Sequence, residues 1–251
     1  MDRLRLRISV FSAAALLLVF LGAQVGEGCP ACWSGYGPGD ERYNKPLADL
    51  RIIYEQKGAQ ALPYIREALK TSTDPLVIKR AAGYLVTLDD KSSINTLRSI
   101  LLEIIKRVAF TTFGPGTNEF QSRLAIAHAL PQLAPTDTAD QMWERYERLD
   151  RNRKAEIPYI LNALKDPLLD ERMKVVLGKE EDHQLMIGAL EALAAGGTPA
   201  IVPYLRGKVE QWRGQSTGPE KGSPGEPSLI YYVPLRIKAE QAIRAIEGRN
   251  Q

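Results

Sequence analysis

Two cysteines, Cys29 and Cys32, are the residues of this chain whose type and spacing most directly suggest chemistry. A Cys-x-x-Cys pair exchanges disulfides when it opens a helix directly after a strand, because the helix N-terminus lowers the thiol pKa. Here Trp33 and a stretch rich in glycine follow the pair, and no strand pattern precedes it. We therefore expect a local disulfide in an oxidising compartment, with a thiol–disulfide activity as the alternative.

The same pair is a poor candidate for a metal or haem site. Zinc would need two ligands beyond the two thiolates, and the histidines of the chain, His128 and His183, lie far away within helical patterns. A c-type haem would need histidine directly after the second cysteine, where Trp33 stands. We expect no metal and no cofactor. A disulfide that closes so short a loop would contribute roughly 2 kcal/mol by chain entropy, which constrains the terminus without holding the fold.

Motifs of catalysis are absent from the sequence. The chain contains no G-x-S-x-G, no H-E-x-x-H, no phosphate-binding G-x-x-x-x-G-K, no G-x-G-x-x-G after a strand and no calcium-loop spacing. With few histidines and only one vicinal cysteine pair, the chain has few side chains that could come together as an acid–base site. We therefore predict no catalytic residues and no enzymatic activity.

The N-terminus has the composition of a secretory signal peptide. Met1 to Arg7 is basic, Ile8 to Leu21 is apolar, and small residues follow. As a helix, the apolar stretch would span about 21 Å, which is shorter than the roughly 30 Å hydrocarbon layer of a membrane. We expect a cleaved signal, with processing after Ala23 or after Gly28, and export to the periplasm or the extracellular space.

The position of Cys29 directly after Gly28 also raises the possibility of a lipid anchor. A lipidation signal places a small apolar residue two positions before the cysteine, and Glu27 stands there. Lipid anchoring at Cys29 is therefore the less favoured alternative. A membrane is expected as a partner only if the N-terminus is lipidated or uncleaved.

The charge of the chain does not point to nucleic acid. Its 251 residues are 44% hydrophobic and 25% charged, which is typical of a globular domain. The net charge is +3, and the first 23 residues hold three arginines against one aspartate, so the remainder is close to neutral. Without a run of Lys and Arg interleaved with aromatic residues, we expect no nucleic-acid partner.

Three segments repeat one pattern of apolar residues around a Pro-Tyr pair, namely 61–65, 156–160 and 201–205. Apolar residues continue from them at helical spacing, which places a stripe on one helical face. Proline at such a position is typical of the first turn of a helix, where its missing N–H is not needed. We therefore predict that each segment begins a helix.

A second set of helices is expected to follow the first. Asp74-Pro75 and Asp166-Pro167 predict breaks, since the residue before proline avoids helical geometry. Apolar periodicity predicts helices after Pro75 and over 120–133, 184–195 and 233–246, and a short helix over 46–56 is expected to cover the N-terminal end. Glycines that are typical of helix ends follow at Gly58, at Gly196-Gly197 and at Gly248.

This layout resembles HEAT and armadillo-type repeats. The likeness rests on the Leu62-Pro63-x-Ile65 first helix, the Asp-Pro turn and the second helix from Val77 to Leu88, and it is closest over 59–91 and 182–206. It implies an all-α fold, an α-α superhelix or HEAT-like solenoid of about four to five helix pairs, each burying its apolar face against its neighbours. The repeat register within 92–151 is left open.

The resemblance also implies an interaction scaffold for an unidentified protein partner. The concave face formed by the second helices is the expected binding surface, with Tyr84 and His128 as candidate exposed residues. Some HEAT-like proteins resemble bilin lyases, so a lyase-type enzyme is a further alternative. That alternative would need a pocket with converging charged groups, which the sequence does not identify.

The expected organisation has three parts. Residues 1–23 form the signal peptide, 24–45 form a cysteine-containing N-terminal segment, and 46–251 form the helical repeat domain. Within this domain the segment 213–228 is rich in glycine, proline and serine. Such a composition buries too little apolar surface to order itself, so a mobile loop is expected there.

Overall fold

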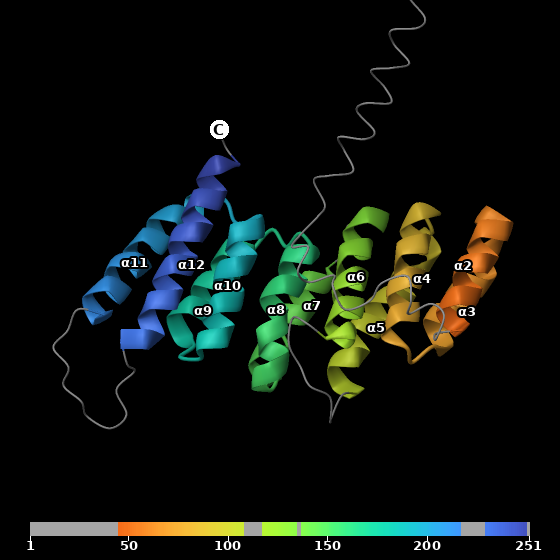
Figure 1. The fold of residues 1–251 in the computed structure, drawn as a ribbon, viewed down its shortest axis with the longest axis horizontal. Coiled ribbons are helices and arrows are strands. Elements are labelled where there is room, and N and C mark those ends of the chain that lie inside the picture. The colour runs from red at the N-terminus through yellow and green to blue at the C-terminus, as the bar shows by residue number, and fades with distance from the viewer. Residues whose placement is uncertain (1–44, 108–116, 135–136, 217–228, 250–251) are drawn as a thin grey trace, which may run out of the picture. The chain divides into compact units, whose positions relative to one another are not determined.

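The computed structural model describes residues 45–107, 117–134, 137–216 and 229–249, and every regular element in these ranges is helical (Figure 1). The chain divides into two units, Met1–Lys45 and Pro46–Gln251. None of the helices within the described ranges is long and apolar enough to cross a membrane. The predicted all-α class is confirmed for this part of the chain.

The helices follow one another with short connections. Their bounds are α2 Lys45–Lys57, α3 Leu62–Thr71, α4 Pro75–Thr87, α5 Ile94–Arg107, α6 Asn118–Leu133, α7 Thr138–Trp143, α8 Arg151–Ala163, α9 Leu169–Lys179, α10 His183–Gly196, α11 Val202–Ser216 and α12 Leu229–Gly248. Turns of 3₁₀ helix lie at Gly58–Ala61, Lys91–Ser93, Tyr146–Arg148 and Pro199–Ile201. The predicted helices over 46–56, 120–133, 184–195 and 233–246 are confirmed, each with bounds a few residues wider.

Most helices pack against their neighbours in sequence, and they do so in two ways. In the first kind of packing, consecutive helices form pairs, namely α3 with α4, α5 with α6, α7 with α8, α9 with α10 and α11 with α12. The second joins the later member of each pair to the next, so that α4, α6, α8, α10 and α12 form one continuous row (Figure 1). The buried apolar residues of all these helices make one core cluster.

The predicted Asp-Pro breaks are both present, with different local chemistry. Asp74 precedes α4 and its carboxylate accepts a hydrogen bond from the backbone N–H of Leu76 at 2.8 Å, which is an ordinary N-cap. The carboxylate of Asp166, between α8 and α9, is buried and accepts from the N–H of Leu168 at 3.0 Å and from Arg172 at 3.0 Å. The second break therefore contains a buried ion pair.

The prediction that residues 156–160 begin a helix was wrong. Pro63 and Pro203 lie in the first turns of α3 and α11 as predicted, but Pro158 lies inside α8, which begins at Arg151. The cap is Asp150, whose carboxylate accepts from the N–H of Arg153 at 3.1 Å. This helix therefore belongs to the row between α6 and α10, and α9 is the helix that pairs with α10. The local Pro-Tyr pattern is the same, but the upstream cap decides where the helix starts.

The N-terminal helix of the described chain packs on α4 through aromatic residues. Leu47 and Leu50 of α2 are buried, and the ring of Tyr54 stacks on that of Tyr84 with centroids 4.0 Å apart. At the other end, α11 continues to Ser216 and so includes the first residues of the predicted mobile loop. The rest of that loop, 217–228, lies outside the described residues, as do Cys29 and Cys32.

The predicted glycine positions end helices for two different reasons. Gly58 follows α2 with φ +54°, the left-handed conformation that glycine adopts without strain. Gly197 follows α10 with φ −65°, which any residue can adopt. Its lack of a side chain matters instead, because a Cβ there would lie 2.7 Å from the carbonyl oxygen of Leu193.

We predict that Gly197→Ala lowers the free energy of unfolding by about 1–3 kcal/mol, because the backbone of α10 must shift to admit the methyl group. Gly207→Ala on α11 is the matched control, since a Cβ there meets nothing within 4 Å. The control is expected to raise stability by roughly 0.5–1 kcal/mol through the better helix propensity of alanine. Urea titrations compare the two, and equal effects would contradict the close approach at Gly197.

Candidate functional site

The row of α4, α6, α8, α10 and α12 has one open side. Each inner helix of the row is flanked by two neighbours and covered on a third side by its pair partner, so its remaining side faces solvent. On three successive helices the exposed and half-exposed residues recur at helical spacing, which places them on a single stripe. They are Gln121, Ala125, His128 and Gln132 on α6, Asn152, Ala155, Tyr159 and Asn162 on α8, and Gln184, Ile187, Glu191 and Ala195 on α10.

Over α6, α8 and α10, the open face is polar but almost free of charge. Past their first turns, α6 and α8 expose no charged residue, and on α10 the exposed and half-exposed residues include one, Glu191. The helices behind the row differ, since α9 and α11 expose charged side chains such as Glu171 and Arg206. Because the sequence as a whole is 25% charged, this part of the open face is depleted in charge relative to the rest of the protein.

Glu191 joins three helices of the row. Its carboxylate accepts a hydrogen bond from the Tyr159 hydroxyl of α8 at 2.6 Å and from the Lys238 ammonium of α12 at 2.5 Å. Burial, and then the hydrogen bond to the Glu191 carboxylate, raise the pKa of the Tyr159 phenol, so the phenol remains a donor at neutral pH. The charge of Glu191 is thus neutralised by its own neighbours across the row.

Tyr159 is held in place from two further directions. Its ring meets that of Phe120 of α6 edge to face, with centroids 5.7 Å apart. On the other side, a Cβ on Gly188 of α10 would lie 3.3 Å from the ring, so the missing side chain lets α10 approach α8 closely. The orientation of Tyr159 on the open face therefore depends on three consecutive helices of the row.

A groove lies beside this network, between α10 and α12. Its volume is about 330 Å³, and it is lined by Leu190, Glu191, Ala194, Ala195, Lys238 and Gln241. The leucine and the two alanines give it an apolar floor, while the three polar side chains stand around it. Arg249 at the end of α12 donates hydrogen bonds to the carbonyl oxygens of Ala194 and Gly197, which ties the end of α10 to α12.

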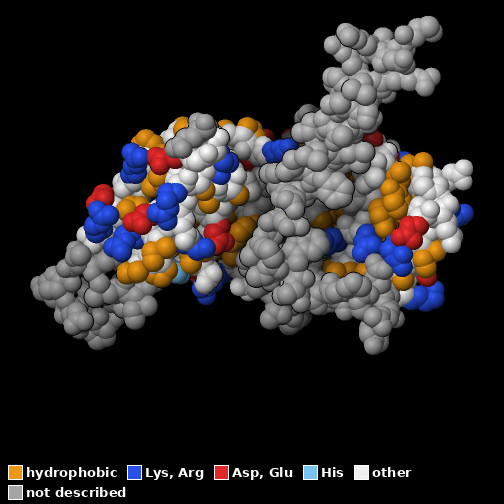
Figure 2. All heavy atoms as spheres, turned by 45° about the horizontal axis from the view of Figure 1, so that its top comes forward, with side chains coloured by type: hydrophobic (Ala, Val, Ile, Leu, Met, Phe, Trp, Pro, Cys, Tyr) orange, Lys and Arg blue, Asp and Glu red, His pale blue; other side chains and the backbone are white. Residues whose placement is uncertain are grey.

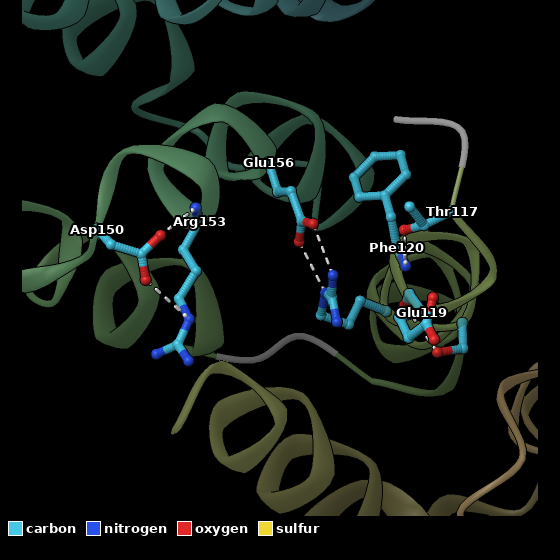
Figure 3. Close-up of polar contacts among 8 residues, drawn as sticks. Thr117, Glu119, Phe120, Asp150, Arg153 and Glu156 are labelled. Carbon is cyan, nitrogen blue, oxygen red and sulfur yellow. Dashed lines mark hydrogen bonds and ion pairs between the residues drawn. The ribbon is translucent and has the colours of Figure 1, made fainter. Parts of the chain in front are cut away.

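Beneath the open face, a buried ion pair connects α6 to α8 (Figure 3). Arg123 donates two hydrogen bonds to the carboxylate of Glu156, at 2.7 and 2.6 Å, and both side chains are almost fully buried. Desolvation raises the pKa of Glu156, and the hydrogen bonds from Arg123 oppose that shift. A pair with such directional geometry fixes how α6 lies against α8, and hence the spacing of the two stripes.

The two residues expected on the binding surface have different environments. His128 is exposed on the open face of α6. Tyr84 of α4 is half-buried, because its ring stacks on Tyr54 of α2. No described contact joins Tyr84 to His128, and nothing is described of the third candidate site, the Cys29–Cys32 pair.

Sequence reasoning did not single out Glu191, Lys238 or Gln241. Their partners lie on other helices, so spacing along the chain gives no signal for them. One clue was available, since Glu191 is a lone charge within the apolar helix from Leu185 to Ala195. A lone charge in an otherwise apolar helix indicates either a paired or an exposed position, and Glu191 is paired and half-exposed.

The residues that the structure describes contain no group of three or more His, Cys, Asp and Glu side chains placed to hold a metal ion. No family model matches the chain, and no curated protein or solved structure matches it significantly. The arrangement on the open face is therefore interpreted from its own chemistry, which is that of a surface for hydrogen bonding and close packing.

Proposed function

We propose that this protein is an exported helical-repeat scaffold, which binds a protein partner through the open face of α6, α8, α10 and α12. In this proposal the helix pairs are HEAT-like units that stack as a solenoid, and the row formed by their second helices is the binding side. The successive packing of the pairs and of the row supports this interpretation. Export rests on the signal-like residues 1–23, and the partner is expected in the same compartment.

The observation that carries the proposal is the depletion of charge on the part of the open face that α6, α8 and α10 form. The cores of protein interfaces are poor in charged residues and enriched in tyrosine, because a buried unpaired charge is costly. The open face shows carboxamides, His128, Tyr159 and small residues, with Glu191 already neutralised by Lys238. Carboxamides donate and accept hydrogen bonds without carrying charge, so they suit a polypeptide ligand.

The test introduces single charges into the face. We expect Gln184→Glu and Gln241→Glu each to reduce the amount of partner captured with the tagged protein from the exported fraction of its native host. Both residues are exposed, so the fold should be unaffected. A loss of about tenfold is expected if each new charge is desolvated at a cost of ~1.4 kcal/mol or more.

Gln211→Glu is the matched control, because Gln211 is exposed on α11, behind the row. It adds the same charge and should capture as much partner as the parent protein. Equal loss in all three variants, or no loss in any, would refute the assignment of the open face.

A further inference from the structure

The acidic side chains of α12 leave part of its positive charge without a counter-ion. Glu240 lies 3.9 Å from Arg236, and Glu247 lies 2.7 Å from Arg206 of α11. Both acids are therefore occupied, Glu240 within α12 and Glu247 across to α11. Figure 2 shows several basic side chains over α11 and α12, with fewer acidic ones among them.

Two arginines of α12 are not matched in this way. Arg249 bonds to the carbonyl oxygens of Ala194 and Gly197 and makes no ion pair with any described carboxylate. Arg244 is exposed, one turn beyond Gln241, and it makes no ion pair with the described residues either. Lys238 balances Glu191 alone. Counted over its described side chains, α12 thus carries two positive charges, Arg244 and Arg249, that no described carboxylate matches.

The groove itself offers an apolar surface near these charges. Leu190, Ala194 and Ala195 form its floor, and its volume of about 330 Å³ is at the small end for ligand pockets. It therefore suits a single large side chain rather than a whole ligand. Lys238 uses one of its three donors on Glu191, and the Gln241 carboxamide has no partner among the described residues, so polar groups at the edge are available.

We propose that the groove between α10 and α12 binds an acidic segment of the partner protein, which inserts one apolar side chain between the two helices. The carboxylates on either side of that apolar side chain pair with Arg244 and Arg249. Gln241 and Lys238 form hydrogen bonds with the backbone of the acidic segment. The inference rests on the proposed function and adds to it the charge of the partner and the place where it is anchored.

An acidic peptide fits these features better than other macromolecules do. A basic segment would meet Arg244 and Arg249 without a free carboxylate, since Glu191 is bonded on both oxygens. A nucleic acid binds through many phosphate contacts, and two unmatched arginines beside an apolar floor do not provide them. Charge complementarity therefore selects the acidic polypeptide.

The test uses synthetic peptides on the intact protein. The probe is a fluorescein-labelled peptide with one leucine flanked by Asp and Glu, and two variants replace its acids with lysines or its leucine with glycine. Fluorescence anisotropy at low salt should show saturable binding of the acidic peptide and binding at least about tenfold weaker for both variants. The affinity should fall as salt is added, because the paired arginines are exposed.

Protein variants locate the binding. Combining Arg244→Glu with Arg249→Glu should reduce binding of the acidic probe by at least about tenfold, and Ala195→Trp should block the groove sterically. Arg213→Glu on α11, an exposed residue paired with Glu210, is the matched charge reversal and should leave binding unchanged. No saturable binding, equal affinity for the lysine peptide, tighter binding of a labelled single-stranded oligonucleotide, or unchanged binding by the double variant would each overturn the inference.

Failure here is distinguishable from failure of the proposed function. If the partner is still captured and Gln184→Glu still releases it, the open face binds a protein whose segment at α10 and α12 is not acidic. If the charges on the open face have no effect on capture, the proposed function itself fails, whatever the peptides do.

Discussion

Glu156→Leu is expected to lower the free energy of unfolding by about 3–5 kcal/mol, because it leaves the Arg123 guanidinium buried without a counter-ion. Both side chains are nearly inaccessible to solvent, with 2% and 4% of their surfaces exposed. Water therefore cannot replace the lost carboxylate without opening the contact between α6 and α8. Urea titration followed by far-ultraviolet circular dichroism measures the change.

The double variant Arg123→Met with Glu156→Leu separates the charge from the packing. Replacing both members of a buried ion pair with apolar residues of similar size is often neutral or stabilising, so we expect most of the lost stability to return. A double variant as unstable as Glu156→Leu alone would show that shape, and not the uncompensated charge, determines the cost at this contact.

The second large effect is expected at Asp90, at the turn after α4. The Arg66 guanidinium, aided by the hydroxyls of Ser93 and Ser92 and opposed by burial, holds the pKa of Asp90 well below its usual range. A carboxyl group with a depressed folded pKa stabilises the fold above its unfolded pKa of about 3.9, and this contribution is lost as the pH falls below that value. Asp90→Asn should therefore cost about 2 kcal/mol at neutral pH.

The cost of Asp90→Asn should shrink as the pH is lowered from about 5 towards 2, because the parent protein then loses the same stabilisation. Asp89→Asn is the matched control. Asp89 is exposed and lies 3.7 Å from Lys91, and its φ of +49° is tolerated by asparagine. Urea titrations across this pH range compare the variants. A constant difference between the parent and Asp90→Asn would contradict the role of the ionised carboxylate.

The fold was predictable where signals are local. Apolar spacing and the Asp74-Pro75 break located α3 and α4, and Gly58 marked the end of α2. The same local reasoning failed at Pro158, because a Pro-Tyr pattern like those of α3 and α11 was preceded by the Asp150 cap. A helix starts where an N-cap residue satisfies its first backbone N–H groups. A sequence pattern that lies further along the helix does not reveal that position.

The candidate site was less predictable because it depends on contacts between helices. The sequence predicted four helices of the row, α4, α6, α10 and α12, and His128 on their surface. It did not assign α8 to the row, and the Tyr159–Glu191–Lys238 network joins residues on three separate helices. The role of Tyr84 was also decided by a distant segment, since Tyr54 of α2 covers its ring. The contact partners of a surface residue follow from packing, and packing is set by tertiary register rather than by spacing along the chain.

The central claim is that the open side of the helix row contacts a protein partner. Photo-crosslinking tests it most directly, with a photoreactive amino acid placed in turn at His128, Gln184 and Gln241, and at Gln211 behind the row. All four residues are exposed, so each reactive group is accessible. After irradiation of the native host, we predict the same cross-linked protein band from the three positions on the open face and none from Gln211. Adducts from Gln211 alone, or from all four positions equally, would contradict the claim.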